Sequence, residues 1–332
     1  MKGERCGTDE KISLLTEALS RHPRDYCGGL AEGPSGFPPS PIVMQPGRIA
    51  STAGAIAALA ALDCRCAPDT GAPAGRLYEV RGARLYVETR GSGAPLVFLA
   101  GGLHYFGNSF EAQTDYFARS RTVIGIDQRG HGHSPDTPQP FSYRDMAEDT
   151  AAVIERLGLA KVDVVGHSDG GDVGLCLARY HPGLVRRLVI SGANLASGRT
   201  PADTERLAHY TYPEIIKALP PIIASWGEDY ARVSPDGAAH WSTVVAKDWL
   251  LWLTPVVLDA AELKAIDIPV LVMAGDRDLI PLDETLKIFH GLPRGQLLII
   301  PGTWHNTFQA RPDIVNPAIE RFLDEADPAR PH

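Results

Sequence analysis

The sequence has no cluster of lysine and arginine, and its acidic side chains exceed its basic ones, giving a formal net charge of −8 and an isoelectric point near 5.8. A negative protein repels phosphate backbones and anionic lipid, so nucleic acid and an anionic membrane surface are disfavoured as partners. The sequence also has no glycine-rich phosphate loop and no dinucleotide fingerprint. We therefore expect no nucleotide cofactor, and no other cofactor is indicated.

Long apolar runs are missing as well. The Ala-rich stretch from Ile49 to Leu62 is too short to span a membrane, although it has the length of a signal-peptide core. If translation began at Met44, this stretch would be an export signal with Arg48 as its only basic flank. The alternative is a short helix packed on the domain. We expect a soluble protein without a membrane span, cytoplasmic in the second case and exported in the first.

Cysteine is scarce beyond the first 75 residues, where Cys176 stands alone. This distribution gives no disulfide framework, and we expect Cys176 to be buried in a helix. His131 and His133 resemble a metal pair, but no second ligand cluster has zinc-like spacing, so both are interpreted as structural and no metal is expected. Asp127 is interpreted as ending its strand and organising the loop that carries these histidines.

From residue 76 onward, strand-like and helix-like segments alternate. This order predicts an α/β fold with a mostly parallel central sheet and helices on both faces. We expect the core to occupy residues 76–194 and 267–326, with a helical cap at 195–266 inserted after the sixth core strand. Residues 1–75 form an Ala-, Gly- and Pro-rich extension that we expect to be poorly ordered, and 327–332 form a tail.

A Gly-x-Ser-x-Gly motif lies where an apolar strand, residues 161–166, runs into a helix, residues 171–180. Gly166 and Gly170 remove side chains that would collide where strand and helix converge, so Ser168 is held out as an attacking group. His167 beside it is interpreted as a packing residue. The pattern indicates a nucleophile elbow.

A serine hydroxyl needs a base and an orienting acid to attack at neutral pH. The strand at 268–274 ends in a turn with two carboxylates, Asp276 and Asp278, and the strand at 296–300 runs into a loop with His305. Asp276 lies nearest the strand and can brace the turn, whereas Asp278 lies further into the loop and can reach a histidine. We therefore predict Ser168, Asp278 and His305 as a catalytic triad.

A tetrahedral intermediate also needs N–H donors for its oxyanion. The N–H of Asp169 lies at the amino end of the helix after the serine, where the helix dipole favours negative charge. The second donor should follow the strand at 95–100. The N–H of Gly102 is our first choice for it, and that of Leu103 is the alternative.

With these motifs, the chain resembles an α/β-hydrolase-fold serine hydrolase over residues 76–326. The matching segments are Leu-Val-Phe-Leu-Ala-Gly-Gly-Leu at 96–103, Asp-Gln-Arg-Gly-His-Gly-His-Ser at 127–134, Gly-His-Ser-Asp-Gly-Gly at 166–171, Ala-Gly-Asp-Arg-Asp at 274–278 and Trp-His-Asn at 304–306. The order serine, acid, histidine is the one this fold uses. Many relatives carry a histidine where this chain has Ala100, a departure that puts the rigidity of the following loop in doubt.

Within this family the segment around Ser168 is similar to the valacyclovir hydrolase or biphenyl-hydrolase-like group. That resemblance implies that Asp169 binds a cationic amino group of the substrate, and a buried carboxylate near an ammonium is a sound pairing. Alternatively, Asp169 only stabilises the start of its helix.

The substrate pocket is less well marked. His104 and Tyr105, together with Leu103, follow the oxyanion strand and could line it. Trp249 and Trp252 of the cap could supply an apolar wall, or could pack the cap onto the core. We predict a serine hydrolase that cleaves small to medium apolar or aminoacyl carboxylic esters through an acyl-enzyme. The same triad would serve a carbon–carbon bond hydrolase or a lactonase, and a catalytically silent binding protein is a further alternative.

Overall fold

The computed structural model describes residues 75–196, 200–254 and 256–325. The predictions for the amino-terminal extension before residue 75 and for the tail at 327–332 lie outside these residues. Within them, no helix is both long and apolar enough to cross a membrane.

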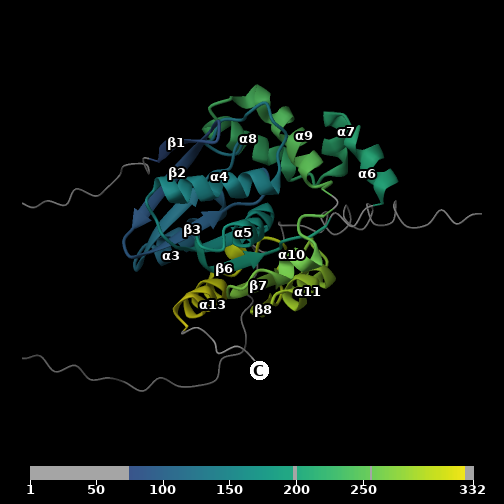
Figure 1. Cartoon of the computed structure of the whole chain (residues 1–332). Helices are drawn as coiled ribbons and strands as arrows, with labels where there is room; N and C mark the ends of the chain where they lie inside the picture. Colours follow the sequence, from purple (N-terminus) through teal and green to yellow (C-terminus); the bar gives the residue numbers. More distant parts are fainter. Residues whose placement is uncertain (1–74, 197–199, 255, 326–332) are drawn as a thin grey trace, which may run out of the picture. The chain divides into compact units, whose positions relative to one another are not determined.

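The described residues form one eight-stranded sheet (Figure 1). Its strand order is β1-β2-β4-β3-β5-β6-β7-β8. The first three strands in this order pair antiparallel, and every other neighbouring pair is parallel. This confirms the predicted mostly parallel sheet. The strands are β1 (Arg76–Val80), β2 (Ala83–Gly91), β3 (Ala94–Leu99), β4 (Arg121–Ile126), β5 (Val162–His167), β6 (Val185–Ser191), β7 (Val270–Gly275) and β8 (Gly295–Ile300).

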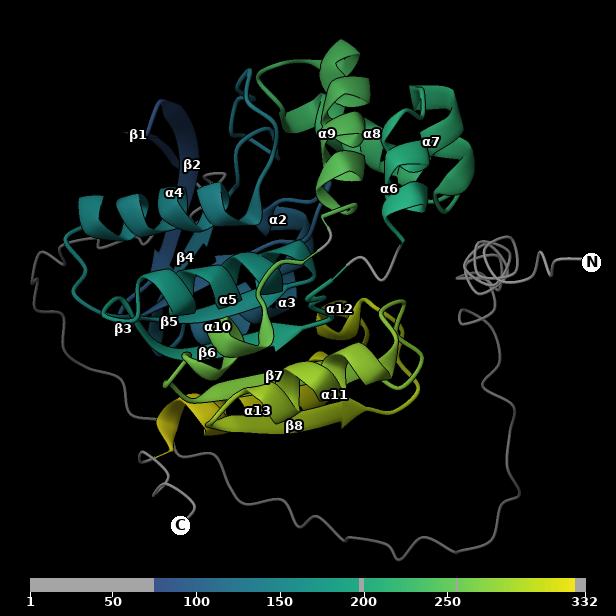
Figure 2. The same ribbon diagram turned by 45° about the vertical axis from the view of Figure 1, so that its right-hand side comes forward.

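Helices cover both faces of the sheet (Figure 2). The helices are α2 (Phe106–Ser109), α3 (Glu111–Phe117), α4 (Tyr143–Arg156), α5 (Asp169–Tyr180), α6 (Pro201–Ala208), α7 (Tyr212–Ala218), α8 (Ile223–Val233), η1 (Ala238–His240), α9 (Trp241–Leu251), α10 (Ala260–Lys264), α11 (Leu282–Gly291), α12 (Thr307–Ala310) and α13 (Pro312–Asp324). One apolar core lies between the sheet and α4, α5 and α11, and a second lies under α2, α3, α12 and α13. The central strands β5 and β7 are buried along their whole length, which explains why their sequences are nearly continuous apolar runs.

The parallel register brings the carboxyl ends of five strands to one edge. Leu99 of β3 lies beside Gly166 of β5, and His167 lies beside Ser191 of β6. Ser191 in turn lies beside Met273 of β7, and Gly275 beside Ile300 of β8. The loops after β3, β5, β7 and β8 therefore leave the sheet next to one another, and these are the loops that carry the predicted site.

Between β6 and β7 the chain forms a run of helices, which we call the inserted helices: α6, α7, α8, η1 and α9. Residues 195–266, for which a helical cap is predicted, contain these helices and also α10. α10 contacts the core helices α5 and α11.

Candidate active site

Ser168 stands at a sharp turn between β5 and α5. Its backbone has φ 53° and ψ −122°, a conformation that costs a non-glycine residue on the order of 1–3 kcal/mol. The turn is possible because its flanking glycines lie against backbone: a Cβ on Gly166 would lie 2.2 Å from the Gly170 oxygen, and one on Gly170 would lie 2.0 Å from the Leu99 oxygen. Strain maintained at one half-buried serine is typical of a functional position.

His305 connects Ser168 to Asp278. Its Nε2 lies 2.9 Å from Ser168 Oγ, and its Nδ1 lies 2.7 Å from Asp278 Oδ1. Asp278 Oδ1 also accepts the backbone N–H of Ile280 at 2.9 Å. Burial opposes ionisation of this carboxyl, but the hydrogen bonds and charge of His305 outweigh it and lower the pKa of Asp278. The ring is therefore held with one nitrogen on a carboxylate and the other facing the serine hydroxyl.

The second carboxylate of the turn points elsewhere. Asp276 is exposed, and its backbone N–H donates to the Ile300 oxygen at 3.1 Å, which ties the turn to the end of β8. The structure thus brings Asp278, and not Asp276, to His305.

Of the three N–H groups considered for the oxyanion, one is already engaged. The Leu103 N–H donates to Asp248 Oδ2 at 2.9 Å, so this N–H, the alternative to that of Gly102, does not face a substrate oxyanion. The N–H groups of Gly102 and Asp169 have no acceptor within the described ranges. The Asp248 bond also answers the doubt raised by Ala100, because it braces the loop that follows β3 from a different element.

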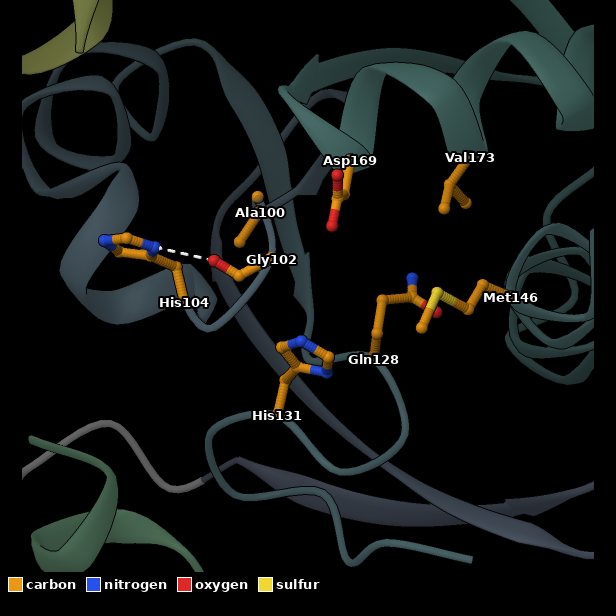
Figure 3. Close-up of a pocket in the computed structure, with 9 residues that line it drawn as sticks. Ala100, Gly102, His104, Gln128, His131, Met146, Asp169 and Val173 are labelled. Atoms are coloured by element: carbon orange, nitrogen blue, oxygen red, sulfur yellow. Dashed lines mark hydrogen bonds between the residues drawn. The ribbon is translucent and has the colours of Figure 1, made fainter. Parts of the chain in front are cut away.

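Buried polar side chains, among them Asp169 and His131, line a small cavity beside this loop (Figure 3). Asp169 Oδ2 accepts the indole N–H of Trp252 at 2.8 Å, and Oδ1 accepts the Tyr143 hydroxyl at 3.1 Å. Burial and the neighbouring Asp248 carboxylate raise the pKa of Asp169 to about 6. The Asp169 side chain points from the start of α5 into this cavity, whose lining includes Gly102. Each carboxylate oxygen has a second lone pair, so each can still accept a further hydrogen bond.

His131 is the positive partner in this cluster. Its Nε2 lies 3.0 Å from Asp248 Oδ2, and its Nδ1 lies 3.0 Å from the Arg129 carbonyl oxygen. Burial alone would lower its pKa, but the Asp248 charge and both hydrogen bonds raise the pKa of His131 to about 9. Both ring nitrogens of His131 are thus hydrogen-bonded, and the positive charge of the ring offsets the negative charge of the buried Asp248 carboxylate next to the site.

Three further residues of these loops, Asp127, His133 and His167, are interpreted as structural from the sequence. Asp127 accepts the N–H groups of Phe106 and His133, which organises the loop, and the His133 ring stacks on Tyr86. Within the described residues, no group of three or more His, Cys, Asp or Glu could hold a metal ion. Burial lowers the pKa of His167 to about 3. Its Nε2 donates to the His305 carbonyl oxygen at 2.8 Å and so holds the loop that carries His305.

The predicted pocket residues divide into two groups. His104 lines the cavity, with its Nδ1 2.9 Å from the Gly102 oxygen and its ring against Trp226 (Figure 3). Trp252 also lies beside Gly102. By contrast, Trp249 is buried within the inserted helices, stacked on Tyr210 with its N–H on the Leu207 oxygen.

Two further predicted pocket residues are part of the packing. Tyr105 is buried with its ring edge-on to His133, and the Leu103 side chain is buried in the core. The contacts of Tyr105, Leu103 and Trp249 in the structure are thus packing contacts, and their place at a substrate stays a prediction.

Sequence reasoning missed Asp248, Tyr143 and the true partner of Trp252. A signal for Asp248 was present: it is the one charged residue on the helical stripe formed by Trp241, Val244, Val245, Asp248 and Leu251, all of which are buried. A carboxylate on an apolar stripe must have a partner when it is buried. The sequence does not identify that partner, because the Leu103 N–H lies 145 residues away.

The sheet order, the strained serine turn and the Ser168–His305–Asp278 arrangement at the sheet edge define the architecture of an α/β hydrolase. Comparison with known proteins agrees. Residues 94–220 match the alpha/beta hydrolase fold family. The chain is 30% identical over 260 residues to RutD of Agrobacterium fabrum, described as a carbamate hydrolase, covering 70% of this chain and 95% of that protein.

Two other proteins extend this comparison. The mouse serine hydrolase BPHL is 26% identical over 255 residues, covering 74% of this chain and 84% of that one. The solved structure of Est816, an N-acyl homoserine lactone degrading enzyme, is 25% identical with a TM-score of 0.59, covering 74% of this chain and all of its own. The chain belongs to the α/β-hydrolase family. It is a hydrolase of that fold, as the resemblance in the sequence predicted.

Proposed function

We propose that the protein is a serine hydrolase that cleaves carboxylic esters of small molecules by two-step acyl transfer. His305 Nε2 takes the proton of Ser168 Oγ as the oxygen attacks the ester carbonyl, and Asp278 stabilises the resulting imidazolium. The N–H groups of Gly102 and Asp169 bind the oxyanion. His305 then protonates the departing alcohol, and water enters by the same route to release the acid and regenerate Ser168.

One observation carries this proposal. The Ser168 hydroxyl, the His305 ring and the Asp278 carboxylate form a continuous hydrogen-bonded chain, with links of 2.9 and 2.7 Å. Two N–H groups without acceptors in the described residues lie on the loops beside the same serine. A strained serine, an oriented base and unoccupied donors are the parts that acyl transfer needs.

A fluorophosphonate probe tests the proposal directly. We expect a covalent adduct on Ser168, located by peptide mass spectrometry, because the probe reacts only with an activated serine. The adduct should be lost in His305→Ala and kept in His290→Ala, a control at an exposed histidine of α11. A folded wild-type protein without any adduct would contradict the proposal and favour a silent binding protein.

The choice of ester over other bonds rests on the same chemistry and needs a substrate panel. A lactone is a cyclic ester and would be opened by the same steps, whereas a vinylogous diketone must first be protonated at carbon. We expect open-chain esters to give the highest kcat/KM. A preference for a homoserine lactone or a diketone at equal acyl size would move the assignment to those classes.

We further propose that the esters include aminoacyl esters, with Asp169 binding the amino group. The cavity beside Gly102 is lined by two acceptors: the Asp169 carboxylate and the Gln128 side chain, whose Oε1 has no donor in the described residues. His131 is the cation of this cluster, and it faces two carboxylates, Asp169 and Asp248. An ammonium group would supply donors to both acceptors and offset the second buried carboxylate.

The amino group should therefore raise kcat/KM. We expect phenylalanine ethyl ester to exceed 3-phenylpropionic acid ethyl ester by about 10- to 100-fold, the value of one charge-assisted hydrogen bond. Asp169→Asn should abolish the preference, because an amide carries no negative charge to attract the ammonium, and the readout is the ratio of kcat/KM for the two esters within each variant. Asp172→Asn, at a buried carboxylate one turn further along α5 and not among the residues lining the cavity, is the matched control. Equal rates for the two esters in the wild type would refute this part of the proposal.

A further inference from the structure

The last turn of α9 contacts both sides of the proposed oxyanion hole. Asp248 and Trp252 are four residues apart, so their side chains lie on the same side of this turn. Asp248 accepts the N–H of Leu103, the residue after Gly102, and Trp252 donates its indole N–H to the Asp169 side chain. One turn of an inserted helix thus contacts the residue that follows one proposed oxyanion donor, Gly102, and the side chain of the other, Asp169.

The Asp248 contact fixes an unusual backbone. Leu103 has φ 61°, in the left-handed region that a leucine seldom adopts. Such a conformation persists only where surrounding contacts hold it, and the hydrogen bond from the Leu103 N–H to Asp248 Oδ2, 2.9 Å long and buried, is one of these contacts. The peptide that this bond anchors adjoins Gly102.

The charge of Asp248 is maintained from the opposite side by His131. Both nitrogens of the His131 ring face oxygens that can only accept: a carboxylate oxygen and the Arg129 carbonyl. Protons on both nitrogens satisfy both oxygens, and the Asp248 charge together with these hydrogen bonds raises the pKa of His131 to about 9, so the ring is an imidazolium at neutral pH. An ionised acceptor binds the Leu103 N–H more strongly than a neutral one would.

The Trp252 and Asp169 side chains leave no space for a side chain at position 102. A Cβ at that position would lie 2.4 Å from Asp169 Oδ2 and 2.9 Å from Trp252 Cζ2. Gly102 is packed against the hydrogen bond between those two side chains, so its peptide has a rigid neighbour on one side and the anchored Leu103 on the other.

We propose that the last turn of α9 sets the geometry of the oxyanion hole, with Asp248 as a positioning residue that holds the Gly102–Leu103 loop. This inference rests on the acyl-transfer function proposed above. It makes the inserted helices part of the catalytic machinery, because the hole is complete only when α9 is seated on the loop. Asp248 itself touches neither the substrate nor Ser168.

Asp248→Asn tests the inference. The variant keeps the size of the side chain but removes the ionised acceptor and the counter-charge of His131. We expect kcat for p-nitrophenyl butyrate to fall by about 10- to 100-fold, less than the loss of an oxyanion donor itself, with KM within about threefold. A trifluoromethyl ketone, whose adduct with serine places an oxyanion in the hole, should lose affinity by the same factor as kcat. A residue with only a structural role would lower stability without this parallel loss.

Asp136→Asn is the matched control. Both Asp136 oxygens accept from Lys247 Nζ at 2.8 Å. This variant therefore removes the negative charge of an ion pair to the same helix that does not involve the oxyanion loop. We expect its kcat and ketone affinity to stay within about threefold of wild type, because the oxyanion donors keep their geometry. Equal losses in both variants, or no loss in a folded Asp248→Asn, would overturn the inference.

Trp252→Phe provides an independent second variant if Asp248→Asn does not fold. It keeps an aromatic side chain at this position but loses the indole N–H that donates to Asp169, and we expect the same parallel loss in kcat and ketone affinity. Unchanged values in that variant would reject the inference. A wild-type enzyme that neither cleaves the ester nor binds the ketone would instead reject the proposed function itself, and the inference with it.

Discussion

Ser168→Ala is expected to lower kcat for ester hydrolysis by at least about 10⁴-fold, and by up to about 10⁶-fold if the triad acts as a unit. The reason is that no neighbouring group can take over as nucleophile. Cys176, the cysteine in the described residues, is buried in α5, and burial raises the pKa of its thiol to about 12. Any residual rate would come from the oxyanion donors and substrate binding alone.

The measurement is steady-state hydrolysis of p-nitrophenyl esters, with the unfolding midpoint recorded alongside. Stability should change little, since the substitution removes one hydrogen bond, to His305 Nε2, from a half-exposed hydroxyl. Ser225→Ala serves as the control, because that serine is exposed on α8 and its hydroxyl donates to its own helix. Retention of more than about a tenth of the wild-type rate in Ser168→Ala would be incompatible with a serine mechanism, given the size of such effects in known triads.

The fold could be predicted because its signals are local. The strands β5 and β7 are apolar along their length since both faces are buried, and a segment of that kind can be recognised without knowing its partners. The observed strands begin or end within one or two residues of the predicted ranges. Once the strands are parallel, chain order alone places the loops after β5, β7 and β8 at one edge, which is why Ser168, Asp278 and His305 could be grouped in advance.

The surroundings of the site could not be predicted in the same way. Asp248 meets Leu103 and His131 across 145 and 117 residues, and such contacts depend on how α9 is rotated and seated. Helical periodicity identifies the buried stripe of α9 but not the atoms that it faces. The same limit explains Trp249 and Trp252: they lie three residues apart, yet one packs among the inserted helices and the other reaches Asp169.

Asp278→Asn should have the second of the two largest effects, a fall in kcat of about 10³- to 10⁴-fold with the fold intact. The carboxylate accepts the proton on His305 Nδ1, which leaves Nε2 unprotonated and facing Ser168 Oγ. An amide at this position can instead donate its N–H to Nδ1. The ring would then carry its proton on Nε2 and could no longer remove the serine proton, so the loss comes from the wrong tautomer and not from a displaced ring.

Asp276→Asn is the internal comparison for this prediction, because both carboxylates stand in the same turn two residues apart. Asp276 is exposed, and the backbone bond from its N–H to Ile300 survives the substitution, so kcat should stay within about threefold of wild type. Rates of ester hydrolysis and of fluorophosphonate labelling should fall together in Asp278→Asn, since both require an activated serine. If Asp276→Asn lost activity while Asp278→Asn kept it, the acid would be misassigned. If neither substitution mattered, His305 would work without a carboxylate partner, and the hydrogen bond to Asp278 would serve only to hold the loop after β8.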